Sequence, residues 1–395
     1  MSEIESHEAA GVATLPAPSL GSAESSVSAP RRRNRFATKP VAVAILVLVL
    51  LALPIYLPPF WLGVGLFSMS AALGAIGLNL LMGTAGQLSL GHAFFVAVGA
   101  YGYAWFAGDS GRAGTVDLSG LGLPPVLAFI LAVLLAGLAG VLFSPISGRM
   151  RGLYLAVATL ALVYIGRHVL LNAKPITGGY NGRRVPEMEF FGFALADHSP
   201  DDLPVFGVPF GHLERLWFFG LLLVALGWWL ARNLLRGRPG RALAALRDNE
   251  LAASVMGVPV ARYRAAAFTV SSMYAGAAGV LLGLIYERIV PDSFGIMLSI
   301  SFIAMIVIGG LGSVGGAIAG AVFVSALPLV LGHYGEYLPL VVPAGMEGSG
   351  VSPVEASNYL YGIAIIVVLV FAPGGLAGTA QTLVRGLKRV LHSEK

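Results

Sequence analysis

The chain has 395 residues, of which 56% are hydrophobic and only 11% carry a charged side chain. Soluble domains carry roughly 25% charged residues, so this composition excludes an ordinary soluble protein and predicts an all-α polytopic membrane protein. The net charge of +5 comes without a basic patch interleaved with aromatic residues, which argues against a nucleic-acid partner. The absence of cysteine excludes disulfides, thiol catalysis and cysteine-based metal sites.

The N-terminal segment, residues 1–39, is rich in Ala, Ser, Pro and Glu and ends in the basic sequence RRRNRFATK. No apolar run precedes Arg31, so the order of segments differs from that of a signal peptide. We interpret residues 1–39 as a disordered cytoplasmic tail whose basic end fixes the topology of the first span. We interpret the C-terminal residues 377–395 as a second cytoplasmic tail.

Residues 40–376 predict a transmembrane domain of about ten helices. A spanning helix needs about 20 residues, and several of the apolar runs are shorter or are broken by glycine. Two pairs of runs are joined only by GTAG and GLGS, which predicts either tight inner turns or the tips of re-entrant elements. The runs are 41–57, 61–82, 87–107, 122–146, 152–171, 213–232, 265–286, 296–309, 314–332 and 358–372.

The distribution of Lys and Arg predicts the topology. With ten spans and a cytoplasmic N-terminus, most of these residues fall in the inner segments and few in the outer ones. Such an excess on the cytoplasmic side sets the orientation of membrane proteins. The sequence therefore predicts that both termini are cytoplasmic, with the longest outer loops at 172–211 and 333–357. These loops are interpreted either as contacts for an extracellular partner or as plain connections.

The sequence RGRPGRALAALRDNELAASVMGVPVARYR, residues 236–264, is a polar, arginine-rich stretch between long apolar runs. Residues 241–247 are rich in Ala and Leu and predict a short helix after a turn at Pro239–Gly240. Asp248 or Asn249 predicts the N-cap of a second helix, because these side chains accept hydrogen bonds from free backbone N–H groups.

Glu250 falls in the first turn of that second helix, where the helix dipole favours a negative charge. Gly257 and Pro259 predict its end. The charge of this loop fits the general excess of Lys and Arg in cytoplasmic loops, whereas its capped, folded form fits a docking element for a soluble partner. The residues alone leave both interpretations open.

Catalytic and metal-binding residues are not predicted. The sequence contains no GxxxxGK[ST] phosphate loop, no HExxH and no evident Ser–His–Asp arrangement. Within the ten runs the only acidic residue is Glu214, at the start of 213–232. The lack of a carboxylate in the middle of a span argues against a proton symporter but leaves sodium coupling through backbone carbonyls open. The polar residues that we expect to line a translocation pathway are Asn79, Gln87, Ser89, His92 and Thr159. For His92, packing inside the bundle is the alternative to a contact in the pathway.

Several segments together resemble the LivM-type permeases of branched-chain amino acid ABC transporters. These segments are GLNLLMGTAGQLSLGHAFFVAVGAY (77–101), RGLYLAVATLALVYIGRHVLLNAKPITGGYNG (151–182), GRALAALRDNELAASVMGVPVARYRAAAF (240–268), IGGLGSVGGAIAGA (308–321) and FAPGGL (371–376). The resemblance implies the ten-helix architecture of type II ABC importers, with a cytoplasmic coupling loop, here 233–264, between the sixth and seventh spans. The N-terminal tail and much of 186–211 and 333–357 lie outside it.

The resemblance also assigns roles to residues. ELAASVMG resembles the EAA…G pattern of the helix that docks on the ATP-binding subunit, which implies that Arg247, Asp248 and Glu250 are surface contacts. GQLSLGH implies that Gln87, Ser89 and His92 lie beside the central pathway. The coupling residues implied are Arg247, Asp248, Asn249, Glu250, Ala253 and Gly257. The outer-side motif TGG..G comprises Thr177, Gly178, Gly179 and Gly182, for which turning of the backbone by glycine is the alternative to a role in transport.

For partners, the resemblance implies a second homologous permease, two ATP-binding subunits and an extracellular or periplasmic substrate-binding protein, within the lipid of a bacterial cell membrane. ATP would bind to the partner subunits, and no cofactor is expected on this chain, which we expect to be a transport subunit and not an enzyme. Urea or a short amide is the alternative substrate. A secondary carrier that works alone is the alternative from another functional class.

Overall fold

The computed structural model describes residues 38–113, 116–190, 193–194, 204–205, 208–209, 211–334, 351–372, 374–379 and 382. The chain divides into two units, Met1–Leu48 and Val49–Lys395, and the second carries all the features discussed below. The expected tail 1–39 lies almost wholly outside the described residues, as do most of the expected tail 377–395 and much of the outer loops 172–211 and 333–357.

Each of the ten predicted apolar runs contains a helix in the described part of the chain, which confirms an all-α membrane protein. The helices are α1 (Thr38–Tyr56), α2 (Pro59–Leu78), α3 (His92–Ala107), α4 (Pro125–Arg149), α5 (Leu153–Asn172), α7 (His212–Arg236), α10 (Val260–Tyr286), α11 (Ile296–Gly309), α12 (Val314–His333) and α13 (Pro353–Phe371). A short helix, α6 (Lys174–Thr177), follows α5.

Six helical segments of the described residues are long and apolar enough to cross a membrane, and they establish a multi-pass membrane protein. Other helices are shorter: α3 has 16 residues and α11 has 14. At 1.5 Å per residue, a 14-residue helix extends about 21 Å, less than the roughly 30 Å of the hydrocarbon core. The two short helices belong to the two pairs of runs joined by GTAG and GLGS.

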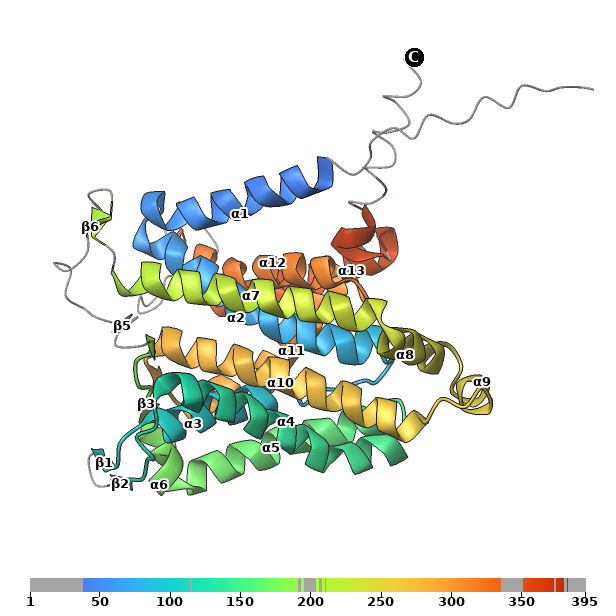
Figure 1. Cartoon of the computed structure of the whole chain (residues 1–395), viewed down its shortest axis with the longest axis horizontal. Helices are drawn as coiled ribbons and strands as arrows, with labels where there is room; N and C mark the ends of the chain where they lie inside the picture. The colour runs from blue at the N-terminus through green and yellow to red at the C-terminus, as the bar shows by residue number, and fades with distance from the viewer. Residues whose placement is uncertain are drawn as a thin grey trace, which may run out of the picture. The chain divides into compact units, whose positions relative to one another are not determined.

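Helix α10 forms the centre of the bundle, packing against α4, α3 and α2, and α2 in turn packs against α12 and α7 (Figure 1). The apolar part of the segment that begins with α2 is 89% buried, whereas that of α5 is 28% buried. Helix α5 contacts mainly α3 and the short elements near its ends. The bundle therefore has a closely packed centre and a loosely attached helix at its edge.

Small residues bring the backbones of the central helices together, as expected for helices that associate in lipid. A Cβ atom on Gly99 of α3 would overlap the backbone of Gly276 on α10. A Cβ on Gly279, one turn further along α10, would overlap the carbonyl of Val96 on α3. One turn before Gly276 on α10, the hydroxyl of Ser272 would lie 2.5 Å from a Cβ on Gly140 of α4. These contacts leave no room between α3, α4 and α10.

Four pairs of short antiparallel strands complete the described fold. They are β1 (Gly111–Ala113) with β2 (Val116–Leu118), β3 (Arg183–Arg184) with β8 (Arg288–Ile289), β4 (Glu189–Phe190) with β5 (Phe193–Ala194), and β6 (Pro204–Val205) with β7 (Val208–Pro209). They lie at one end of the bundle, here named the far end, and the polar stretch after α7 lies at the other (Figure 1).

Candidate functional site

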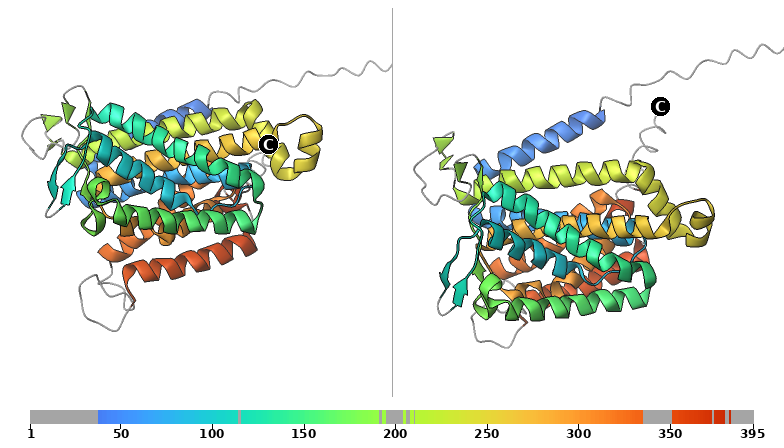
Figure 2. Two further views of the ribbon diagram at one scale, coloured as in Figure 1. Left: turned by 90° about the horizontal axis from the view of Figure 1, so that it is seen from below. Right: turned by 60° about the horizontal axis from the view of Figure 1, so that its bottom comes forward.

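The polar stretch after α7 folds into two helices, α8 (Arg238–Asp248) and α9 (Glu250–Val255), which together form the elbow. In both views of Figure 2 the elbow, in yellow, projects past the ends of its neighbours. The expected turn at Pro239–Gly240 is wrong, because α8 already includes both residues. Proline is tolerated in the first turn of a helix, where its missing N–H has no intrahelical acceptor to lose.

The second helix of the elbow begins and ends at the predicted residues. The Asn249 side chain accepts a hydrogen bond from the backbone N–H of Ala252 at 3.0 Å, so Asn249 and not Asp248 is the N-cap. Gly257 follows α9 with φ +82°, a left-handed conformation that favours glycine. The N–H of Gly257 donates to the carbonyl of Ser254. The elbow is thus a rigid element and not an extended loop.

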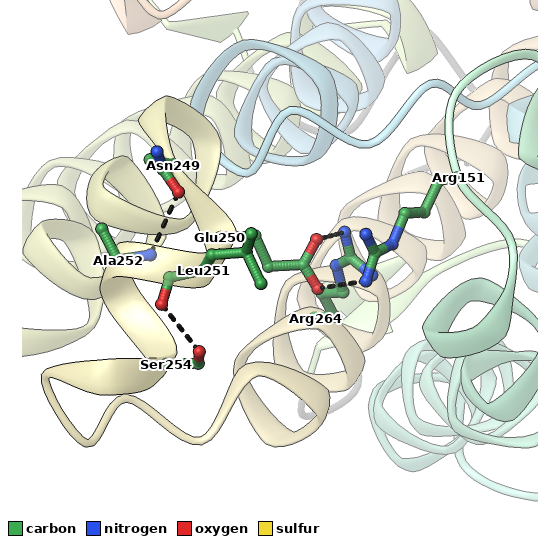
Figure 3. Close-up of polar contacts among 7 residues, drawn as sticks. All are labelled: Arg151, Asn249, Glu250, Leu251, Ala252, Ser254 and Arg264. Atoms are coloured by element: carbon green, nitrogen blue, oxygen red, sulfur yellow. Dashed lines mark hydrogen bonds and ion pairs between the residues drawn. The ribbon is translucent and has the colours of Figure 1, made fainter.

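Glu250 does not point away from the bundle, although we expected it to be a surface contact. Its carboxylate accepts from Arg264 of α10 at 2.8 Å and from Arg151, between α4 and α5, at 3.1 Å (Figure 3). The Glu250 side chain is 20% exposed and that of Arg264 is 15% exposed. Glu250 therefore ties the elbow to two other parts of the bundle.

Arg247 is also turned toward the membrane helices. Its Nη1 donates a 2.6 Å hydrogen bond to the carbonyl of Gly83, at the end of the segment that continues α2. Its aliphatic stem lies over the backbone at Gly86, where a Cβ would be 3.1 Å from the Arg247 Cγ. Arg247 and Asp248 are both exposed, so the hydrogen bond to Gly83 leaves part of the Arg247 side chain at the surface.

The face of α9 that does point away from the bundle is apolar. Leu251 is 75% exposed, Val255 is 88% exposed and Met256 is 72% exposed, while Ala253 on the opposite side is fully buried. Apolar side chains gathered on an exposed surface outside the membrane helices mark a site of protein–protein contact. We name these three residues the apolar face of the elbow.

The first predicted joint, GTAG, is a break between α2 and α3. Helix α2 continues as the π-helical turn η1 (Asn79–Thr84), and an irregular segment, residues 85–91, leads to α3. Irregular backbone at membrane depth is tolerated only where protein groups satisfy its hydrogen bonds. We name η1 together with residues 85–91 the α2–α3 break.

Hydroxyl groups from three elements satisfy the free N–H groups at the start of α3. Thr159 of α5 accepts from the N–H of Leu90 at 2.9 Å, and Ser299 of α11 accepts from that of Ala93 at 3.0 Å. The hydroxyl of Ser89 accepts from the N–H of Gly91 at 3.3 Å. In the structure, Ser89 and Thr159 both accept hydrogen bonds from the backbone of the α2–α3 break, and their place in a translocation pathway stays a prediction.

The remaining predicted pathway residues are buried as well. The Gln87 Nε2 donates to the carbonyl of Arg264 at 3.3 Å, and the Oδ1 of Asn79 accepts from the N–H of Gly312 at 2.8 Å. His92 is 2% exposed, and its ring meets Phe302 edge-on. Among the buried side chains of the described residues, Gln87 Oε1 and His92 Nε2 have no hydrogen-bond partner.

At the far end, the TGG..G motif is a backbone turn. The Thr177 hydroxyl donates to the carbonyl of Leu170 at 2.6 Å and accepts from the N–H of Gly179. Gly178, Gly179 and Gly182 have φ of +77°, +63° and +67°. Backbone torsion angles of this kind favour glycine. Turning of the backbone, the alternative to a role in transport, therefore accounts for the three glycines of this motif.

Arg183 follows this motif, and the sequence did not indicate its role. The side chain is 3% exposed and donates to the carbonyls of Ser119 at 2.6 Å and Ile176 at 2.9 Å. Burial lowers the pKa of the guanidinium from its ordinary value. Arg151 and Arg264 were missed in the same way, because nothing in their local sequence distinguishes them from other basic residues near the ends of spans.

Comparison with known proteins agrees with this architecture. A family model described as branched-chain amino acid transport system / permease component matches residues 60–369. The high-affinity branched-chain amino acid transport system permease protein LivM of Salmonella typhimurium is 34% identical over 276 residues, which are 68% of this chain and 62% of that protein. LivM of Escherichia coli is 32% identical over 309 residues, which are 76% of this chain and 70% of that protein.

A shorter match is the autoinducer 2 import system permease protein LsrC of Klebsiella pneumoniae. It is 36% identical over 121 residues, which are 29% of this chain and 34% of that protein. No solved structure matches the chain. Because the family model covers most of the transmembrane helices, the chain belongs to the family of branched-chain amino acid transport system permease components.

Proposed function

We propose that this chain is the permease subunit of an ATP-driven importer for branched-chain amino acids. Two ATP-binding subunits bind and hydrolyse ATP, and a second, homologous permease completes the translocation pathway. A substrate-binding protein delivers the amino acid at the far end of the bundle. The chain lies in a bacterial cell membrane with both termini and the elbow on the cytoplasmic side.

The apolar face of the elbow is the observation that carries this proposal. Val255 is 88% exposed on a short helix whose other side is held by the Glu250 ion pairs. A plain cytoplasmic loop has no need of capped helices that present Leu251, Val255 and Met256 to water. A fitted groove on an ATP-binding subunit accounts for both the rigidity and the apolar surface.

The proposed substrate follows from the permeases named above, and the composition of the helices is compatible with it. The apolar runs contain no Asp or Glu except Glu214 at the start of one of them, so the pathway relies on mild polar groups such as Gln87 Oε1 and His92 Nε2. Such a pathway lets a partly apolar solute pass without holding it tightly. Specificity then resides largely in the binding protein, and urea or a short amide is the alternative solute.

The first experiment is affinity purification of this chain from its native membrane in mild detergent, with identification of every co-purifying protein. We expect two ATP-binding subunits and a second permease. Repeated recovery of the chain alone, under conditions that preserve other membrane complexes, would contradict the proposal and favour a secondary carrier that works without nucleotide.

The substrate is tested by uptake into proteoliposomes that contain the purified complex, its binding protein and ATP. We expect accumulation of radiolabelled leucine that excess isoleucine or valine suppresses and that excess urea leaves unchanged. Accumulation of urea, with no competition from leucine, would replace the proposed substrate while leaving the importer itself in place.

A further inference from the structure

Three parts of the chain meet at the guanidinium of Arg247. Arg247 belongs to α8 of the elbow, Gly83 to the α2–α3 break and Gly312 to the GLGS turn between α11 and α12. The Arg247 Nη1 donates to the Gly83 carbonyl at 2.6 Å, and Asn79 accepts from the N–H of Gly312 at 2.8 Å. We name these four residues the Arg247 junction.

The junction is closely packed. A Cβ atom on Gly83 would overlap the side chain of Asn79 and the backbone of Gly312. A Cβ on Gly312 would lie 3.6 Å from the Arg247 Nη1 and 3.5 Å from the Gly83 carbonyl. A small displacement of any one of these groups therefore forces the others to move.

The contact with Gly83 has a clear electrostatic reason. The last carbonyls of a helix have no intrahelical partner, and the C-terminal end of a helix carries partial negative charge. Within η1, the carbonyls of Leu80 and Leu81 accept from Ala85 and Gln87, respectively. The carbonyl of Gly83 accepts from Arg247 instead, so a cation on the elbow completes the end of the broken helix.

The elbow holds the α2–α3 break from a second side. Glu250, three residues after Arg247, binds Arg264, whose backbone carbonyl accepts from Gln87 Nε2. Buried apolar residues of α8, Leu243 and Leu246, also pack against the bundle. Apolar packing tolerates sliding, whereas a charge-assisted hydrogen bond to one carbonyl fixes the register.

We infer that Arg247 is a positioning residue that transmits movement of the elbow to the α2–α3 break. When ATP-binding subunits shift the elbow, the guanidinium carries the Gly83 carbonyl with it, and the α2–α3 break, which holds Gln87, changes its position. Arg247 contacts neither ATP nor the solute. The inference rests on the proposed function, because it requires ATP-binding subunits at the elbow.

The test uses the whole importer in proteoliposomes and compares Arg247→Met, Arg247→Lys and Arg241→Met. Methionine keeps an unbranched apolar stem but removes the hydrogen-bond donors of the guanidinium. Lysine keeps the positive charge but lacks the planar guanidinium with its paired N–H groups. Arg241 lies on the same helix, but among the described residues its guanidinium donates only to the carbonyl of Arg236, at the end of α7, at 3.4 Å, so it is the matched control.

The first readout is the amount of solute imported per ATP hydrolysed. Coupling between two sites typically changes an affinity by about 5- to 150-fold, so we expect Arg247→Met to lower this ratio about tenfold while ATP-binding subunits still co-purify. Arg247→Lys should fall between Arg247→Met and the unsubstituted chain, and Arg241→Met should leave the ratio unchanged. An equal loss in Arg241→Met would overturn the inference, as would loss of the ATP-binding subunits in Arg247→Met.

The second readout is conformational. The chain has no cysteine, so Leu88→Cys, within the α2–α3 break at a position 43% exposed, places a single thiol there. We expect its rate of modification by a maleimide to change when a non-hydrolysable ATP analogue binds, and Arg247→Met to abolish that change. A rate that never depends on nucleotide, or one that Arg247→Met leaves as it is, would overturn the inference.

Two outcomes separate this inference from the proposed function. If the unsubstituted chain binds no ATP-binding subunit, the proposed function fails and the inference fails with it. If the unsubstituted complex assembles and imports solute while the Arg247 variants keep full coupling, only the inference fails. Should Arg247→Met not fold, Arg247→Lys carries the test through both readouts: partial loss in both supports the inference, and full coupling with unchanged modification contradicts it.

Discussion

The elbow end and the far end of the bundle are held together by different kinds of contact. At the elbow end, long charged side chains, Glu250 and Arg247, reach across to other segments. At the far end, Gly178 and Gly182 place backbone directly against backbone, β3 pairs with β8, and the buried Arg183 side chain binds two backbone carbonyls. Exposed or half-exposed side-chain contacts can be broken and remade, whereas glycine turns and a buried side chain are held in one geometry. We therefore expect movement at the elbow end and a fixed platform at the far end.

The strongest way to break this comparison is Gly182→Ala. Gly182 has φ +67° and ψ −173°, a region essentially restricted to glycine, and an added Cβ would overlap the Ile289 carbonyl. We expect a loss of about 3 kcal/mol in stability, measured as a lower apparent Tm in detergent. The control is Gly111→Ala at the same end, where no atom lies within 4 Å of the added Cβ. Equal behaviour of the two variants would show that the far end is not rigid.

The second prediction concerns the apolar face of the elbow. Val255→Asp places a charge at a position 88% exposed, so it should spare the fold while removing apolar contact with an ATP-binding subunit. Burial of a valine side chain contributes about 2 kcal/mol, which corresponds to roughly a 30-fold weaker Kd for the purified ATP-binding subunits. Val255→Leu keeps the surface apolar and should bind normally. Unchanged binding by Val255→Asp would move the docking site elsewhere.

The third prediction sharpens the account of Glu250. Glu250→Gln keeps the shape but removes the charge between Arg151 and Arg264, and we expect local stability to fall by about 1 to 2 kcal/mol, seen as faster amide hydrogen exchange in α9. Asp248→Asn, an exposed neighbour with the same charge change, should have little effect. In double-mutant cycles, Arg264 at 15% exposure should couple to Glu250 more strongly than Arg151 at 68%. Stronger coupling of Glu250 to Arg151 than to Arg264 would show that burial does not govern the strength of these two ion pairs.

The smallest effect is expected at the far end. Arg112 and Asp117 form an ion pair between β1 and β2 with side chains 71% and 84% exposed. Exposed pairs contribute little because water and salt screen them, so Arg112→Gln should change stability by less than about 0.5 kcal/mol. A larger drop in apparent Tm would show that this exposed ion pair also holds the platform.

The sequence predicted the helices well because each depends on local composition. An apolar run of sufficient length forms a helix in lipid whatever its neighbours are, and Asn249 caps α9 through a contact only three residues away. The start of α8 was misplaced because proline is compatible both with a turn and with the first turn of a helix. Local rules do not separate these two cases.

The directions of the charged side chains were beyond such reasoning. Glu250 pairs with Arg151, 99 residues away, and Arg247 with Gly83, 164 residues away. An isolated elbow sequence gives no sign that its charges turn inward and that its apolar residues remain exposed. The sequence singled out Ser89 and Thr159 as polar residues within apolar runs. It could not show that the start of α3 takes its hydrogen bonds from hydroxyl groups on α5 and α11, because these helices are distant in the chain.

The glycine contacts among α3, α4 and α10 have a practical consequence. Backbone touches backbone at Gly99 and Gly279, so α3 and α10 cannot slide past each other without separating, and the side chains between α4 and α10 are packed as closely. We therefore expect these three helices to form a fixed frame of reference during transport. Spectroscopic labels placed in pairs on this frame should report a constant distance, and every displacement measured from it can be assigned to the second label alone.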